Sequence, residues 1–207
     1  MGKNRELRDA GYLYDGTSGE PELTEDRNRA KDLCFEFNCL TRPSDTKRQQ
    51  ELLDKILGKH GKNTGITAPF YVDYGYQIEV GDNFYANHNL VVLDPAKVRI
   101  GNNVFIACNV TLTTAGHPTD AETRNKGIEY AYPITIGDDV WIGANVCVLP
   151  GVTIGSNVVI GAGSVVNKDI PSGVVAAGNP CRPIREITEA DKYKYLVPPK
   201  CCEQQKQ

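Results

Sequence analysis

The sequence lacks the features that mark several classes of protein. No apolar run approaches the length of a membrane span, and residues 1–8 are charged, without the apolar core of a secretion signal. Position 6 is Glu6, where N-myristoylation would require Ser or Thr. A net charge of −3 and a pI of about 5.7 give no bulk attraction to nucleic acid or to an anionic membrane. We therefore expect a cytoplasmic protein without nucleic-acid or membrane partners.

Cysteine pairs of the C-x-x-C type are also absent, and the seven cysteines are odd in number. Without a secretion signal, an odd number favours free thiols. Five are expected to be structural, because no base that could activate a thiol is evident nearby: Cys34, Cys39, Cys108, Cys147 and Cys181. Cys201 and Cys202 lie in a polar tail and are expected to be exposed.

Residues 1–60 differ in pattern from the rest and predict a small helical cap on a larger body. Thr24 can cap a helix whose apolar positions follow the i, i+3, i+4, i+7 spacing of one helix face: Ala30, Leu33, Cys34 and Phe37. Arg42-Pro-Ser44 ends that helix, and Ser44 can cap a second one that stops near Gly58. The chain is long enough for this cap and for one domain with a substantial core.

Residues 61–187 show aliphatic residues that recur at every sixth position. Four copies of one phrase, an aliphatic residue and Gly followed by two polar residues, begin at Val80, Ile100, Ile136 and Ile154. A spacing of six fits neither a helix nor an alternating strand, and the last two copies are three sixes apart. The pattern predicts a triangular solenoid with one hexapeptide per side. Its short parallel strands would stack about 4.8 Å apart, with aliphatic side chains inside and Gly, Asn or Asp at the corners.

The six-residue repeat fails at two places. Asp94-Pro-Ala-Lys97 inserts two residues, and the coil after Ile100 resumes at Ile136 instead of at position 118, so that residues 113–133 form an extruded loop. The loop contains Thr114-Ala-Gly-His-Pro118. Function often lies in loops on a rigid scaffold, which makes His117 the main candidate for chemistry. Residues 188–207 are expected to form a C-terminal helix and tail, with a helix starting near Ile184.

Further distinctive segments are Trp141-Ile-Gly-Ala, Val148-Leu-Pro-Gly-Val-Thr-Ile-Gly, Gly161-Ala-Gly-Ser and Ala177-Gly-Asn-Pro. With the hexapeptides and the T-A-G-H-P loop, they resemble the left-handed β-helix acetyltransferases. Three segments are similar to the maltose and galactoside O-acetyltransferase branch of that family: Arg29-Ala-Lys, Glu36-Phe-Asn and Asn83-Phe-Tyr-Ala-Asn87. The resemblance extends from about residue 5 to residue 190.

This resemblance implies a mainly β fold, a left-handed parallel β-helix with a small N-terminal helical cap. Topology rules alone would favour a right-handed crossover. It also implies transfer of acetyl from acetyl-CoA to a hydroxyl of a sugar such as a galactoside, maltose or glucose, in a homotrimer with sites at the subunit interfaces. No metal is expected, because the three histidines lie in a helix end, a coil turn and a loop, whereas β-helix zinc carbonic anhydrases need three converging ligands.

The family's T-A-x-H-P motif implies that His117 is the general base that takes the proton of the attacking hydroxyl, an effect of about 10²–10⁴ in rate. A turn histidine bonded to the backbone is the alternative. Direct attack in a ternary complex is expected, without an acyl-enzyme. His60 ends a helix and is expected to be solvated, whereas His88 stands where the family often has an aromatic residue and is a candidate to line the acceptor pocket.

The resemblance also implicates residues that contact the two substrates. For the acceptor they are Asp15, Asp73, Tyr85, Asn87 and Asp94, with turn capping as the alternative for each Asp. Pro95 shifts the alignment at Asp94 by one residue. For coenzyme A they are Trp141, Ala144, Gly161, Ala162, Asn167, Lys168, Arg182 and Arg185. Trp141 would flank the pantetheine arm, the cations would face phosphates, and the Ala144 N–H would stabilise the oxyanion by about 2.7–4 kcal/mol.

Two alternatives to this function stay open. The acceptor could be an antibiotic, an amino sugar or a polysaccharide, which would leave the donor chemistry unchanged. A non-catalytic β-helix scaffold is the other alternative, but such a scaffold would be expected to have regular coils without the His117 loop.

Overall fold

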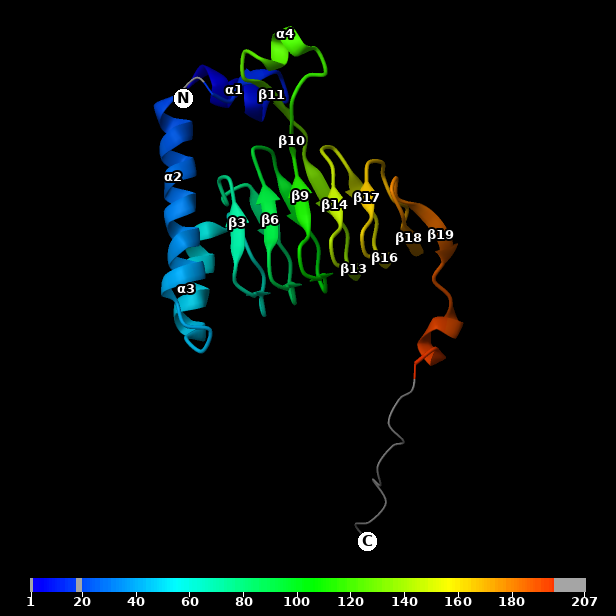
Figure 1. Ribbon diagram of the computed structural model, residues 1–207. Helices are drawn as coiled ribbons and strands as arrows, with labels where there is room; N and C mark the ends of the chain where they lie inside the picture. Colours follow the sequence, from blue (N-terminus) through cyan, green and yellow to red (C-terminus); the bar gives the residue numbers. More distant parts are fainter. Residues whose placement is uncertain (1, 18–19, 196–207) are drawn as a thin grey trace.

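The computed structural model describes residues 2–17 and 20–195, and it consists of N-terminal helices followed by a parallel β-solenoid (Figure 1). Cys201 and Cys202 lie outside the described residues. The helices of the N-terminal part are α1 (Lys3–Asp9), α2 (Pro21–Phe35), its π-helical continuation (Glu36–Leu40) and α3 (Thr46–Ile56). None of the described helices is long and apolar enough to cross a membrane.

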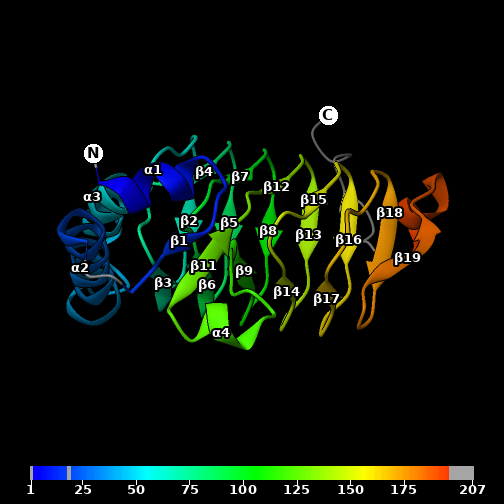
Figure 2. The ribbon, with the colours of Figure 1, turned by 90° about the horizontal axis from the view of Figure 1, so that it is seen from above.

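Helices α2 and α3 cover the N-terminal end of the solenoid (Figures 1 and 2). Ala30, Cys34 and Phe37 of the predicted apolar face are buried, and the Phe37 ring meets that of Phe70 in the first coil edge-on at 6.5 Å. The predicted caps were wrong. Pro21, whose ring presets a helical φ, begins α2 three residues before Thr24, and Asp45 in place of Ser44 caps α3 by accepting a hydrogen bond from the Arg48 N–H.

Three sheets of parallel strands form the sides of the solenoid, and each pairs one coil with the next. The first face contains β4 (Ile78–Val80), β7 (Val98–Ile100), β12 (Ile134–Ile136) and β15 (Thr153–Ile154). The second face contains β2 (Gly65–Ile66), β5 (Tyr85–Ala86), β8 (Phe105–Ile106), β13 (Val140–Ile142), β16 (Val158–Ile160), β18 (Val174–Ala177) and the antiparallel β19 (Arg182–Glu186). The third face contains β3 (Phe70–Val72), β6 (Leu90–Leu93), β9 (Thr111–Thr113), β14 (Cys147–Val148) and β17 (Val165–Val166).

The residues of the six-residue repeat form the core of the prism. Each is 5% exposed or less: Ile100, Ile106, Leu112, Ile136, Ile142, Val148, Ile154, Ile160 and Val166. The predicted fold class, a hexapeptide-repeat β-helix with an N-terminal helical part, is confirmed.

Asn and Gly have different tasks at the corners. Asn83 and Asn103 adopt positive φ, and the side-chain N–H of Asn83 donates to the side-chain oxygen of Asn103 in the next coil at 2.9 Å. Gly81 and Gly101 have no positive φ, but a Cβ on Gly81 would lie 2.8 Å from the backbone of Gly101. Only Asn and Asp therefore supply the left-handed turn in this phrase, while Gly permits close stacking of the coils.

The interruption of the repeat is a hairpin that projects from the prism (Figure 1). It contains β10 (Ala115–Gly116), a short helix α4 (Ala121–Arg124) and β11 (Ile128–Ala131). Beyond the prism, the expected helix near Ile184 was wrong, because Arg182–Glu186 is the strand β19. A 3₁₀ helix (Glu189–Tyr193) follows, with a capping box at Thr188.

Candidate active site

His117 is exposed and directly follows β10 in the hairpin. Its Nδ1 lies 3.0 Å from the backbone oxygen of Ile128 in β11. A carbonyl oxygen only accepts hydrogen bonds, so Nδ1 carries the proton and Nε2 of the neutral ring is unprotonated. The hairpin therefore fixes the tautomer that a general base needs.

The N-terminal segment reaches this hairpin through a strand that the sequence did not reveal. Strand β1 (Tyr14–Asp15) pairs antiparallel with β11, and Asp15 lies opposite Ile128, whose carbonyl binds His117. One carboxylate oxygen of Asp15 accepts from the N–H and the hydroxyl of Thr17, at 2.8 and 3.0 Å. The structure thus places Asp15 in the strand on one side of β11 and His117 at the end of the strand on its other side, with Asp15 in a turn-capping conformation.

Asp73 and Asp94 follow consecutive strands of the third face, at the corner from which the hairpin leaves. Asp94 has no exposed surface, and its Oδ1 accepts from the N–H groups of Asp73 and Tyr74, at 3.1 and 2.9 Å. Burial raises the pKa of Asp94 to about 7, and the nearby Asp73 adds to the shift. Asp94 thus holds the Asp73 turn, the capping role that the sequence left open for it, whereas Asp73 itself is half-buried.

Three large aromatic side chains lie exposed on the second face. Tyr85, Phe105 and Trp141 occupy the same register position in successive coils and are 40%, 52% and 51% exposed. With Asn87 they line a cavity of about 520 Å³. An apolar strip of this kind is typical of a binding surface.

The hairpin with His117 and the exposed aromatic residues of the second face lie on different sides of one prism. The hairpin leaves the chain between β9 of the third face and β12 of the first face, so it projects from the corner opposite the second face (Figures 1 and 2). A single chain thus places His117, Asp15 and the turn of Asp73 at one corner of the prism, and Tyr85, Asn87 and Trp141 on the face opposite that corner.

Ala144 and Gly161 lie at the corner after the second face. The N–H of Ala144 makes no hydrogen bond within residues 2–17 and 20–195, so it is available to a ligand. Packing within the chain already explains the glycine at position 161, because a Cβ there would lie 2.8 Å from the Cβ of Ala177. Its neighbour Ala162 is exposed.

The cationic candidates lie toward the C-terminal end of the prism. The Arg182 guanidinium donates to the side-chain oxygen of Asn167 at 3.0 Å, which brings these two predicted residues together. Lys168 is exposed and makes no ion pair in the described part of the chain. Arg185 forms a two-point ion pair with Asp191 at 2.7 and 2.8 Å, so a phosphate would share this cation with a carboxylate.

Comparison with known proteins identifies the family. The maltose acetyltransferase hexapeptide capping motif matches residues 9–61, and the six-repeat bacterial transferase hexapeptide matches residues 133–168. The galactoside O-acetyltransferase of Escherichia coli K12 is 51% identical over 188 residues, which are 90% of this chain and 91% of that protein. The chain belongs to the maltose and galactoside branch of the hexapeptide-repeat acetyltransferases. It is therefore an acyltransferase, as the sequence predicted.

Solved structures of the same family agree closely with the fold. A galactoside acetyltransferase in complex with coenzyme A gives a TM-score of 0.89 at 47% identity, covering 95% of this chain and 97% of that chain. A maltose O-acetyltransferase from Clostridium difficile 630 gives 0.86 at 46% identity, covering 90% and 98%.

The other two histidines of this acetyltransferase lie apart from His117. His60 Nε2 contacts the Asp54 carboxylate at 2.7 Å. His88 Nδ1 donates to the backbone oxygen of Ala68, and the ring lines a cavity of about 510 Å³ beside the π-helical segment. Within the described ranges, no three His, Cys, Asp or Glu side chains are grouped to hold a metal ion.

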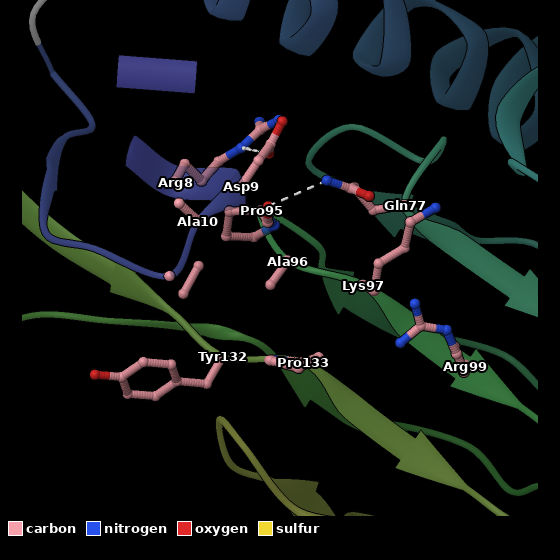
Figure 3. Close-up of a pocket in the computed structure, with 12 residues that line it drawn as sticks. Arg8, Asp9, Ala10, Gln77, Pro95, Ala96, Lys97, Arg99, Tyr132 and Pro133 are labelled. Atoms are coloured by element: carbon pink, nitrogen blue, oxygen red, sulfur yellow. Dashed lines mark hydrogen bonds and ion pairs between the residues drawn. The ribbon is translucent and has the colours of Figure 1, made fainter. Parts of the chain in front are cut away.

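A further cavity, of about 530 Å³, lies between the end of α1 and the first face (Figure 3). Lys97 and Arg99 of the first-face coil and Tyr132 at the base of the hairpin line it. None of the predicted site residues does. We therefore assign neither substrate of the acetyl transfer to it.

Glu129 is a charged residue of the hairpin whose contacts the sequence did not reveal. It lies in β11 opposite Tyr14, whose hydroxyl donates to Glu129 Oε2 at 2.7 Å. Burial first, and then this hydrogen bond, raise the pKa of Tyr14 well above its ordinary value. The alternating strand pattern of Ile128–Ala131 was the available signal, but the sequence does not reveal which strand pairs with it.

Proposed function

We propose that this enzyme transfers the acetyl group of acetyl-CoA to a hydroxyl of a sugar such as a galactoside, maltose or glucose. The observation that carries this proposal is the 3.0 Å hydrogen bond from His117 Nδ1 to the Ile128 carbonyl, because it leaves Nε2 free to accept a proton. Membership of the family and the coenzyme A complex of the galactoside acetyltransferase support the choice of donor.

The proposed reaction is a direct transfer in a ternary complex. The acceptor hydroxyl loses its proton to His117 Nε2 as its oxygen attacks the thioester carbon. The N–H of Ala144 donates to the resulting oxyanion, a contribution of about 2.7–4 kcal/mol in comparable sites. When the tetrahedral intermediate collapses, the C–S bond breaks, and the imidazolium returns the proton to the CoA sulfur.

A homotrimer completes the proposed site. The hairpin with His117, Asp15 and Asp73 would lie against the second face of a neighbouring copy, because one chain keeps these groups on opposite sides of the prism. That neighbour would supply Tyr85 and Asn87 to the acceptor and Trp141 to the pantetheine arm.

The same assembly gives the remaining predicted residues their roles. Gly161 and Ala162 would allow close approach of the cofactor, while its phosphates would meet Asn167, Lys168, Arg182 and Arg185. We also propose a cytoplasmic location, because acetyl-CoA is an intracellular metabolite.

A thiol-release assay with acetyl-CoA and a panel of sugars tests the function. We expect free CoA to appear faster when an acceptor sugar is present. The absence of sugar-dependent release, together with the absence of CoA binding in a calorimetric titration, would contradict the proposal.

A further inference from the structure

The cavity of about 510 Å³ beside the π-helical segment lies at the corner where the second face meets the third. We call it the cap cavity, because one of its walls comes from the N-terminal helical part. That part contributes Cys39, Arg42 and Gln49, and the first two coils of the prism contribute Thr67 and His88. Two parts of the fold that are distant in structure type therefore enclose one space.

Two hydrogen bonds connect the cap cavity to the cavity on the second face that Tyr85 and Asn87 line. The hydroxyls of Thr67 and Tyr85 lie 3.2 Å apart. The backbone N–H of His88 donates to the side-chain oxygen of Asn87 at 2.7 Å. In each pair, one residue lines the cap cavity and the other lines the second-face cavity. The two cavities are therefore direct neighbours on the same chain.

Three side chains of the cap cavity have hydrogen-bonding atoms without a partner in the described part of the chain. The Arg42 guanidinium and the Gln49 amide make no hydrogen bond or ion pair within residues 2–17 and 20–195. His88 Nδ1 donates to the Ala68 carbonyl, which leaves Nε2 of the neutral ring as an acceptor. Hydroxyl groups both donate and accept, so a ligand rich in hydroxyls can satisfy all three side chains.

Apolar side chains complete the lining of the cap cavity. Leu40 is 66% exposed, and Pro43 beside it in the lining is exposed as well. Ligand cavities of about 300–1,000 Å³ typically combine apolar walls with a few polar groups that orient the ligand. A sugar ring matches both features, because its C–H faces are apolar and its hydroxyls form hydrogen bonds.

We propose that the cap cavity is a second acceptor subsite, which binds the sugar unit next to the one that is acetylated. This inference rests on the proposed function, in which Tyr85 and Asn87 contact the acetylated unit. It deepens that function by naming the substrate class as glycosides of at least two sugar units. Because one chain supplies Tyr85, Asn87 and the cap cavity, both sugar units lie along the same subunit.

The test compares two matched pairs of acceptors, maltose with methyl α-glucoside and lactose with methyl β-galactoside. In the wild type, at least one disaccharide should exceed its methyl monosaccharide by about 10-fold or more in kcat/KM. Arg42→Ala removes a charged donor and should lower that ratio about 5-fold or more, with the KM for acetyl-CoA unchanged. Lys47→Ala is the matched control, because it removes an exposed cation of α3 that does not line the cavity.

A second variant blocks the cap cavity without removing a charge. Cys39 is exposed and lines the cavity, so the indole of Cys39→Trp should occupy part of its volume. The ratio of kcat/KM for disaccharide and monosaccharide should then fall to near 1. Thermal unfolding shows whether each variant is folded. Both acceptors are assayed with the same preparation, so a loss of active enzyme does not change the ratio.

Two results would overturn the inference and leave the proposed function intact. One is a wild-type enzyme that acetylates the methyl monosaccharides as efficiently as the disaccharides. The other is a disaccharide preference that Arg42→Ala and Cys39→Trp both keep, which would place the second sugar unit elsewhere. A wild-type enzyme that releases no CoA with any of the four acceptors contradicts the proposed function itself, and this inference with it.

Discussion

The second face and the hairpin contribute to the proposed site in opposite ways. The second face is regular, with Tyr85, Phe105 and Trp141 repeated in register over the buried aliphatic core. The hairpin breaks the repeat, and its polar residues are positioned by pairing with β1 from the distant N-terminus. Regular coils give stability and a flat apolar surface, whereas the irregular segment gives the oriented polar groups. Changes in the two regions should therefore affect different properties.

The largest effect is expected from a cavity in the coils. Ile142 is fully buried, so Ile142→Ala should lower the free energy of unfolding by about 2–5 kcal/mol. Urea denaturation measures this loss. Ile184→Ala is the matched control, because Ile184 is 66% exposed and its truncation should change stability by less than about 0.5 kcal/mol. Equal losses in both variants would contradict the assignment of the core.

His117→Ala should reduce activity and leave stability nearly unchanged. Because the side chain is exposed, stability should hardly change, while turnover falls at least about 10²-fold with little change in CoA affinity. Steady-state kinetics and calorimetric CoA titration measure the two quantities. His60→Ala, at a histidine paired with Asp54 away from the hairpin, should keep full turnover. Activity that survives in His117→Ala would show that another group is the base.

Asp94 lies outside both regions, where it holds the Asp73 turn of the third face, and its effect should depend on pH. Its pKa is about 7 in the folded chain, above the ordinary value of 3.8 for an unfolded Asp. Stability from this group is therefore fully present below about pH 4 and is lost as the pH rises through 7. Asp94→Asn keeps an oxygen that can accept from the Tyr74 N–H, so it should unfold with a flatter pH dependence between pH 4 and 7. If the urea midpoints of the wild type and of Asp94→Asn changed with pH by the same amount across this range, the raised pKa of Asp94 would be ruled out.

The coils could be predicted from the sequence because few folds are compatible with their six-residue period. An aliphatic residue at every sixth position, with Gly and Asn between, is compatible with few structures other than a triangular prism. His117 was chosen as the candidate base for the complementary reason, since it follows the point at which the six-residue period fails. The family motif then supplied its expected role.

The cross-strand partners could not be predicted in the same way. Nothing in Tyr14-Asp15 specifies pairing with β11, which lies more than a hundred residues later, and so Glu129 was missed. Asp94 was identified by alignment, but its burial depends on the packing of the Asp73 turn over it. The N-caps of α2 and α3 lie four residues and one residue from the predicted ones, because Pro21 presets the first helical turn after Glu20, and Asp45 accepts from the Arg48 N–H in place of Ser44.

The most direct test of the account is a subunit-mixing experiment, because the central claim is that His117 and Trp141 act from different copies of the chain. His117→Ala and Trp141→Ala proteins are prepared separately, each with low activity at limiting acetyl-CoA, then denatured, mixed equally and refolded together. In random mixed trimers, roughly one site in four combines the intact His117 of one subunit with the intact Trp141 of its neighbour. The account predicts activity well above that of either variant refolded alone. Activity no higher than the average of the two separate preparations would contradict it.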